Sequence, residues 1–254
     1  TRIQLTEAGR IFAEYAEKIL DLRRQAQNSI NELERVPRGE LIIAANEATC
    51  IYVLPRVFSE YKKQFPNVQL LVDRSYGKHV VDAVLDNLAD FGFSQLPVHD
   101  KKLQVVQVHT DEIKLLVPAA HPLASQASVS CEQLVGQQLL LPKSGATRAK
   151  LNAWLEPVDD KLQISMELDS TEMIKRFVLA GLGLSFMAAS HCREGVAAGE
   201  LAAVSLAPEP VIRRLGLVYR KDKAFSKAGL GFIHVVMVRA GLSEKTPAAD
   251  GIES

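Results

Sequence analysis

The sequence predicts an α/β protein that is preceded by one long amphipathic helix. From Ala8 to Leu33, apolar residues recur every three or four positions, with charged and amide residues between them. That period places the apolar residues on one face of a helix. After Pro37, apolar runs of strand length alternate with segments of helical spacing across short loops. This alternation is typical of a mainly parallel sheet covered by helices.

The opening helix is expected to begin at Thr6, a good N-cap that Glu7 follows in the first turn. The break at Pro37-Arg38-Gly39 should end it after roughly eight turns, about 40 Å. A helix of this length, polar on its other faces, needs a partner helix, and its near-heptad spacing predicts a two-helix coiled contact. We therefore predict dimerisation through one apolar stripe, which consists of Phe12, Tyr15, Ile19, Leu22, Ala26, Ile30 and Leu33.

A first α/β segment is predicted over residues 41–94. Its expected strands are 41–46, 68–72 and 90–94, and its expected helices are 53–61 and 79–88. Between the first strand and the first helix, we expect Glu47-Ala48-Thr49 to form a short polar turn.

A second α/β segment follows the same pattern. The expected strands are 113–117, 138–141, 164–168 and 182–187, with helices over 147–155 and 171–180. A strand over 213–220 and an amphipathic helix over 226–238 come next. The small and polar residues from Ser243 onward predict a disordered tail, 243–254.

Composition narrows the class of protein. The 254 residues are 47% hydrophobic and 24% charged, with 30 basic and 30 acidic side chains. Because the charges balance, there is no overall electrostatic field that would attract nucleic acid or an anionic membrane. No run of residues approaches the ~20 apolar residues of a membrane span. The three cysteines are far apart, which indicates a reducing cytosol rather than a disulfide framework or a zinc knuckle.

Small polar residues occupy the turns that lead from predicted strands into predicted helices. Ligands of open α/β sheets bind there, against helix N-termini that attract anions. The turns are 46–49, 75–78, 143–148 and 169–171. Helix caps use the same residue types, so each turn has a plain structural explanation as well. The turn 143–148 stands out because it joins two hydroxyls and a glycine to Arg148, a set that suits a carboxylate or an inorganic oxyanion.

Catalytic motifs are absent from the sequence. It contains no nucleophile elbow, no phosphate-binding glycine-rich loop and no zinc-protease helix. His191-Cys192 is expected to be a loop or helix-surface pair rather than a metal site, and Asp82, Asp86 and Asp90 a solvated helix face. We therefore predict a binding protein that is not an enzyme and that uses no metal and no cofactor.

These residues also resemble a known family, the LysR-type transcriptional regulators. The opening pattern resembles the junction at which the DNA-binding wing of those proteins passes into the linker helix; it contains Arg2, Leu5, Thr6, Ala8, Gly9, Phe12, Tyr15, Ala16, Ile19 and Leu20. Further matches follow in order: Leu54-Pro55, Phe65-Pro66, Leu85 to Asp90, His121-Pro122-Leu123-Ala124, Ala180-Gly181-Leu182-Gly183-Leu184 and Gly199-Glu200-Leu201. Together they cover nearly all of residues 1–242.

The resemblance implies a two-lobed, periplasmic-binding-protein-like (type 2) effector domain behind the linker helix. Residues 1–36 would be the end of the wing and the linker helix, residues 40–111 and 212–242 regulatory lobe 1, and residues 112–211 lobe 2. Two crossing strands would join the lobes. The family's winged helix-turn-helix would precede Thr1, so we expect a truncated start and DNA binding only through that missing N-terminal domain.

The resemblance also implies a small-molecule effector in the cleft between the lobes. The cleft residues of the family map onto Ala48, Thr49, Gly77, Ser94, Ser144, Thr147 and Phe186, to which we add Asn46, Gln95, Arg148 and Ser170. One departure is Ala48, where relatives often carry a hydroxyl; the adjacent Thr49 could replace it, or the ligand is held differently.

The expected function is therefore effector sensing and self-association, as dimer or tetramer, in a cytoplasmic bacterial regulator. RNA polymerase is a further expected partner, and a membrane is not. Two alternatives share the bilobal scaffold. A solute-binding protein of a transporter would need an export signal and has no use for the amphipathic helix. A phosphate-handling enzyme would use Arg148 with Glu47 or Asp169 as the acid or base.

Overall fold

The computed structural model describes residues 5–31 and 38–242. The chain divides into two compact units, which are described separately. Unit 1 comprises Thr1–Leu41, Arg56–Leu71 and Lys223–Ser254, and unit 2 comprises Ile42–Pro55 and Val72–Asp222.

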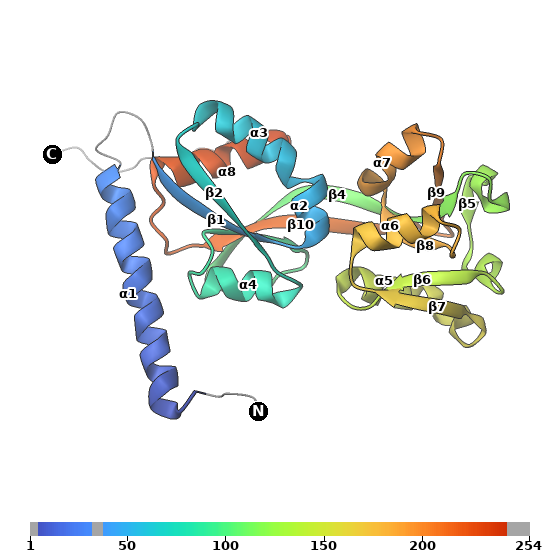
Figure 1. Ribbon diagram of the computed structural model, residues 1–254, viewed down its shortest axis with the longest axis horizontal. Helices are drawn as coiled ribbons and strands as arrows, with labels where there is room; N and C mark the ends of the chain where they lie inside the picture. Colours follow the sequence, from blue (N-terminus) through green and yellow to red (C-terminus); the bar gives the residue numbers. More distant parts are fainter. Residues whose placement is uncertain (1–4, 32–37, 243–254) are drawn as a thin grey trace. The chain divides into compact units, whose positions relative to one another are not determined.

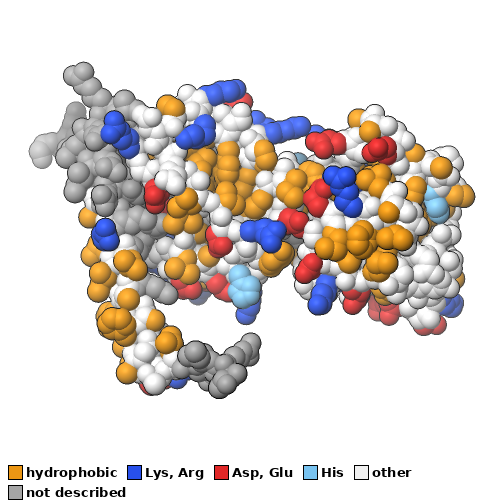
Figure 2. Space-filling view, viewed as in Figure 1, with side chains coloured by type: hydrophobic (Ala, Val, Ile, Leu, Met, Phe, Trp, Pro, Cys, Tyr) orange, Lys and Arg blue, Asp and Glu red, His pale blue; other side chains and the backbone are white. Residues whose placement is uncertain are grey.

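Unit 1 contains the predicted opening helix, α1 (Glu7–Asn31). Thr6 is its N-cap, because the Thr6 hydroxyl accepts a hydrogen bond from the backbone N–H of Gly9 at 3.1 Å. Hydrophobic side chains are exposed along the helix (Figure 2). The predicted end of the helix at Pro37 lies outside the described residues, as does the predicted tail from Ser243.

Two further helices of unit 1 pack through aromatic side chains. Helix α3 (Leu54–Gln64) carries Tyr61, whose hydroxyl donates to the carbonyl of Ala228 at 3.0 Å. The Tyr61 ring meets Phe232 edge-on, with 5.4 Å between centroids. Ala228 and Phe232 belong to α8 (Lys227–Arg239), which Ser226 caps. Both helices were predicted from the sequence, and both predictions are confirmed.

The main sheet has eight strands, seven of them in the order β2-β1-β3-β10-β4-β9-β5, and β8 pairs with β4 (Figure 1). The strands are β1 (Gly39–Ala45), β2 (Val68–Arg74), β3 (Phe91–Gln95), β4 (Leu103–Pro118), β5 (Ser128–Val129), β8 (Ser185–Ala188), β9 (Leu201–Leu206) and β10 (Val211–Arg220). β1 and β3 are parallel, whereas β10 is antiparallel to both of its neighbours. The prediction of a mainly parallel sheet was therefore wrong; the sheet is mixed because β10 returns between β3 and β4.

The longest pairing in the sheet joins β4 to β10. Its register runs from Leu103 opposite Arg220 to Ile113 opposite Val211. Only residues 113–117 of β4 were predicted as a strand, because residues 104–112 carry polar side chains at most positions.

Several other elements of unit 2 lie close to their predicted positions: α4 (Lys78–Leu85), β6 (Gln138–Pro142), α5 (Ala146–Leu155), β7 (Gln163–Leu168) and α6 (Thr171–Leu179). The sequence did not predict α2 (Glu47–Tyr52), α7 (Ala189–Ala197) or the short 3-10 helices at Pro122–Ser125, Cys131–Leu134 and Glu156–Lys161. β6 and β7 form a separate parallel pair. Two predictions were wrong here. Residues 47–49 are the start of α2, because Asn46 caps a helical turn there, with its side chain accepting from Thr49 N. Asp90, expected on a solvated helix face, is buried beyond the end of α4, because its Oδ2 accepts from the backbone N–H of Ile42 at 2.8 Å.

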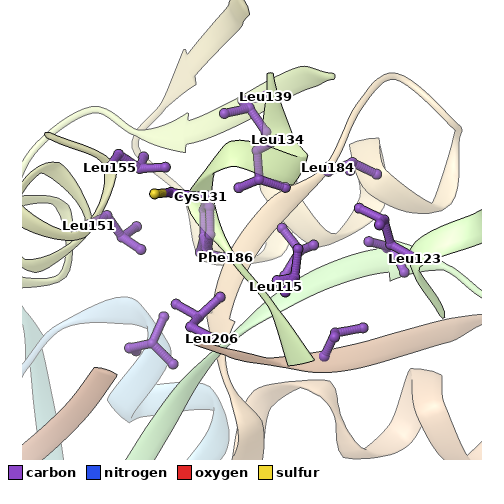
Figure 3. Packing of buried hydrophobic residues seen from close by; sticks show 14 of the residues in the cluster. Leu115, Leu123, Cys131, Leu134, Leu139, Leu151, Leu155, Leu184, Phe186 and Leu206 are labelled. Carbon is purple, nitrogen blue, oxygen red and sulfur yellow. The ribbon is translucent and has the colours of Figure 1, made fainter. Parts of the chain in front are cut away.

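A large apolar core of unit 2 surrounds β4 and β6. Leu115, Leu139 and Phe186 are among its buried side chains (Figure 3). The Trp154 ring packs edge-on against Phe186 at 5.9 Å, and its indole N–H donates to the carbonyl of Ala207. This packing fixes the strands whose ends carry the candidate site.

Candidate functional site

A cavity of about 1070 Å³ opens in unit 2. The ends of β3, β6 and β7 contribute to its wall, together with Asn46, which follows β1, and the first turns of α2, α4, α5 and α6. β8 and the start of β10 contribute further residues. The volume is that of a small-molecule site, and its position at strand ends is where open α/β sheets bind ligands.

Most of the sequence-predicted effector residues line this cavity. They are Asn46, Ala48, Gly77, Ser94, Gln95, Ser144, Thr147, Ser170 and Phe186. They come from turns that are distant in sequence, and the fold brings these turns to one place.

Thr49 and Arg148 are not among the lining residues. Thr49 is fully buried in α2, and its hydroxyl oxygen has no hydrogen-bond partner within the described part of the chain. The Arg148 guanidinium donates to the carbonyl of Pro142 at 2.7 Å and pairs with the Glu167 carboxylate at 2.7 Å. Its Nε donates to Asn152. Arg148 therefore holds the end of β6, next to the cavity, and its Nε and Nη1 are engaged there.

The helix N-termini around the cavity are of two kinds. Asn46 caps α2 and Ser170 caps α6 with their own side chains. In contrast, α4 and α5 begin after Gly77 and Gly145, which have φ of 52° and 100° and provide no side-chain cap. A side chain is strained at such angles. These two helices thus present their first N–H groups without a side chain over them, as anion sites at helix N-termini do.

Direct hydrogen bonds connect the two sides of the cavity. Gln95, at the end of β3, donates through Nε2 to the Thr147 hydroxyl in α5 at 2.9 Å. Glu47 in α2 accepts from the Ser170 hydroxyl at 2.9 Å and from the backbone N–H of Thr171 at 3.1 Å. Glu47 is therefore a second cap for α6, supplied from another helix.

A second cluster joins α2 to α6. The Tyr52 hydroxyl donates to Glu172, and Lys175 donates to the Tyr52 oxygen at 2.6 Å and pairs with Glu172 at 2.6 Å. Burial raises the pKa of Tyr52 well above its usual range, and the bond to Glu172 adds to this effect. Burial opposes ionisation of Glu172, but the hydrogen bonds from Lys175 and Tyr52 outweigh it and lower the pKa of that carboxyl.

Sequence reasoning missed two buried polar residues of the cavity wall, His191 and Arg213. His191 was expected in a loop or on a helix surface, and that prediction was wrong. α7 buries its ring, which stacks on Tyr52 with 4.3 Å between centroids, and buries the Cys192 thiol, which donates to Ala188 O. Burial and the charge of Arg213 lower the pKa of His191 to about 3, so the ring is neutral at pH 7.

One signal in the sequence could have revealed Arg213. It alternates with Leu215 and Leu217 along a strand, and all three are buried. Because alternate residues of a strand point to the same face, an arginine two residues before a leucine is expected on the same buried face of the sheet as that leucine. The adjacent Arg214 points the other way and is exposed.

Residues 5–31 and 38–242 contain no group of three or more His, Cys, Asp or Glu side chains that could hold a metal ion. The cysteines Cys50, Cys131 and Cys192 are free. None of the described helices combines the length and hydropathy that crossing a membrane requires.

Comparison with known sequences identifies a family. The model of the LysR substrate binding domain matches residues 34–238. An uncharacterized HTH-type transcriptional regulator of Bacillus subtilis, YwqM, is 31% identical over 243 residues, covering 91% of this chain and 79% of its own. A probable RuBisCO transcriptional regulator of Trichormus variabilis is 27% identical, with 93% of this chain and 72% of its own covered.

Solved structures share the fold. The CcmR regulatory domain of Synechocystis PCC6803, in complex with 2-PG, superposes with a TM-score of 0.70 at 19% identity, over 79% of this chain and 97% of its own. The effector-binding domain of QuiR, in complex with shikimate, gives a TM-score of 0.68 at 12% identity, over 80% of this chain and 98% of its own. The architecture is thus the two-lobed, periplasmic-binding-protein-like α/β fold of LysR effector-binding domains.

Proposed function

This chain belongs to the LysR substrate-binding domain family, and on that premise we propose that its cavity binds a small anionic effector. The chain is the effector-binding part of a LysR-type transcriptional regulator. The observation that carries the proposal is the cavity itself, which most of the independently predicted effector residues line. Two glycine-capped helix N-termini and the buried Arg213 favour a carboxylate or an inorganic oxyanion.

The ligands of related folds support the same chemical class. The solved CcmR and QuiR domains hold 2-PG and shikimate. Shikimate carries a carboxylate at neutral pH. We extend only the class to this chain, which leaves the identity of the effector to experiment.

We propose that the effector acts by contacting both lobes. With the lobe bounds proposed from the sequence, 40–111 with 212–242 and 112–211, the cavity wall is divided between them. Gly77 and Gln95 belong to lobe 1, and Ser144 and Thr147 to lobe 2. A ligand that touches both sides shifts the relative placement of the lobes in proportion to its differential affinity for the two arrangements.

The same proposal treats the cavity as a site of binding without turnover. The phosphate-handling alternative required Arg148 with Glu47 or Asp169. Arg148 is engaged by Pro142 and Glu167, and Glu47 caps α6. These engagements favour binding over acid–base chemistry, and the relatives are transcriptional regulators.

Self-association through α1 completes the proposed function. Phe12, Tyr15, Ile19 and Leu22 are 75%, 60%, 66% and 67% exposed, and Ala26 is exposed as well. The side chain of Ile30 and the whole of Leu33 lie outside the described residues. A stripe at this spacing is the seam of a two-helix contact. We propose a dimer through α1, and a cytoplasmic tetramer that binds DNA through an N-terminal domain and contacts RNA polymerase.

A thermal-shift screen of small carboxylates and phosphates on this chain tests the sensory function. A ligand at ~100 times its dissociation constant should stabilise the folded state by about 2.7 kcal/mol. The footprint of the regulator with its DNA-binding domain should then change when the same ligand is added. The proposal fails if no metabolite stabilises the chain, or if cavity ligands leave the footprint unaltered.

A further inference from the structure

The cavity wall contains one buried charge that the fold leaves without an ionic partner. Arg213 is 3% exposed. The other ionisable residues along the wall are intermediate or exposed, apart from the neutral His191. A buried guanidinium is costly unless hydrogen bonds and an opposite charge compensate it.

The hydrogen bonds of Arg213 compensate it only in part. Its Nη1 lies 3.3 Å from Nε2 of His191, and no carboxylate in the described part of the chain forms an ion pair with it. The guanidinium carries five N–H donors. Since His191 is neutral, Nε2 is assigned as the acceptor and Nδ1 carries the ring proton.

Asp111 is the nearest candidate counter-ion, and its oxygens are engaged elsewhere. It faces Arg213 across the β4–β10 ladder. Its Oδ1 accepts from the backbone N–H of Glu112 at 2.9 Å, and its Oδ2 accepts from that of Ser190 at 3.2 Å and lies 3.5 Å from His109. Asp111 therefore attracts Arg213 through space but does not occupy its donors.

Arg213 lies in the cavity wall beside other candidate ligand-binding residues. Arg213 lies two residues before Leu215 on β10. Leu215 pairs with Gln95 of β3, and Gln95 lines the same cavity. Arg213 and His191 both belong to the wall. A planar guanidinium matches two oxygens of a carboxylate or phosphate at once, which a lysine does not.

We propose that Arg213, oriented by His191, binds the oxyanion group of the effector inside the cavity, as a carboxylate or a phosphate. This assignment rests on the proposed sensory function and names the residue that selects the ligand class. The bound oxyanion supplies a counter-charge in direct contact with the guanidinium, which Asp111 does not. The residue is thus a specificity determinant that the turn motifs did not indicate.

The test uses the 254-residue chain with acetate and inorganic phosphate as probes, against chloride at equal ionic strength. Thermal unfolding is recorded for wild type, Arg213→Met, Arg213→Lys and Arg214→Met. Arg214 is the matched control, since it is exposed on the same strand. The Nε–H resonance of Arg213, assigned by its loss in Arg213→Met, reports direct contact with the anion.

Wild type and Arg214→Met should show saturable stabilisation by at least one oxyanion and a shift of the Arg213 resonance. Arg213→Met should bind at least ~10-fold more weakly, because two charge-assisted hydrogen bonds are lost. Arg213→Lys should fall between the two, and it serves as the test variant if Arg213→Met does not fold. A response to acetate alone assigns a carboxylate, to phosphate alone a phosphate, and to both a shared oxyanion subsite.

Stability without anion separates a ligand-binding role from a structural one. Methionine replaces, at similar volume, a buried charge that forms no direct ion pair, so anion-free Arg213→Met should be at least as stable as wild type. A clear loss of stability would indicate a structural arginine. An unchanged anion response in Arg213→Met, or no saturable response of wild type to either oxyanion, overturns the assignment.

The two proposals fail separately. A metabolite that binds Arg213→Met as tightly as wild type removes the role of Arg213 and leaves the sensory function intact. A screen in which no metabolite binds removes the sensory function itself.

Discussion

Glu47 and Thr171 are joined by a hydrogen bond that makes a residue of one helix the cap of another. The Glu47 carboxylate accepts from the Thr171 backbone N–H at 3.1 Å, and its other oxygen accepts from the Ser170 hydroxyl at 2.9 Å. A carboxylate at a helix N-terminus is favoured by both the free N–H groups and the helix dipole. Because α2 and α6 both border the cavity, this cap fixes the distance across it.

Replacing Glu47 by Ala should destabilise the protein. Loss of an N-terminal cap and its charge is expected to reduce the free energy of unfolding by about 1–2 kcal/mol. Urea denaturation followed by Trp154 fluorescence measures the change. Glu209→Ala removes an exposed carboxylate and is the control. Equal stability of the two variants would contradict the assigned cap.

Removing the Thr147 hydroxyl should weaken effector binding more than it weakens the fold. Thr147→Val keeps the shape of the side chain but loses the bond from Gln95, at a cost of about 1 kcal/mol in stability. We expect effector affinity to fall by about tenfold if the hydroxyl also contacts the ligand. Calorimetric titration of a ligand from the metabolite screen measures this. The expectation fails if Thr147→Val binds as wild type does.

The buried imidazole of His191 should make the protein less stable in mild acid. Its pKa is about 3 in the folded state, against 6.5 for the ordinary side chain, because burial and Arg213 disfavour the charged form. Between pH 3 and pH 6.5 the unfolded chain binds more protons than the folded chain does. The contribution of neutral His191 to stability is therefore complete above pH 6.5 and is lost as the pH falls toward 3. Between pH 6.5 and 5 the loss should be about 2 kcal/mol.

Unfolding by urea at several pH values between 7.5 and 5 tests this dependence. His191→Asn should give a flatter profile than wild type, whereas His79→Asn, which alters an exposed ring, should retain the slope. Parallel profiles for wild type and His191→Asn would show that other groups carry the acid sensitivity.

Polar substitution in the apolar stripe of α1 should weaken self-association. Ile19→Gln replaces one of the exposed side chains at the proposed seam, whereas Arg23→Gln alters an exposed residue outside the stripe. Loss of a buried isoleucine from a dimer contact should cost about 2–3 kcal/mol, which raises the dissociation constant by more than tenfold. Sedimentation equilibrium measures it. A monomeric wild-type chain would contradict the dimer, as would an Ile19→Gln dimer of unchanged affinity.

Strongly periodic segments were predictable from the sequence, and weakly patterned ones were not. The apolar stripe of α1 and the amphipathic patterns of α3 and α6 indicate a helix in each segment without any knowledge of the rest of the fold. Residues 104–112 were missed because a strand with polar side chains has no strong signature until its neighbours pair with it. The same holds for the short β5 and β9, and for α2, whose first residues also suit a turn.

The candidate site divides in a similar way. Residues in strand-to-helix turns were found because the chemistry of those turns is local. Arg213 and His191 were missed because their burial depends on β10 and α7 packing beside elements remote in sequence. Arg148 was predicted as an anion ligand because it shares a turn with two hydroxyls and a glycine, and only the fold reveals that its Nη1 contacts Pro142 and Glu167.

The place of β10 in the sheet has a consequence for synthesis. This strand lies between β3 and β4 but is made long after both. Until β10 leaves the ribosome, β3 and β4 lack the strand that pairs with both of them. Unpaired strand edges promote aggregation. A nascent polypeptide that stops short of Val211 should therefore remain chaperone-dependent, because the sheet becomes continuous only when β10 has been made.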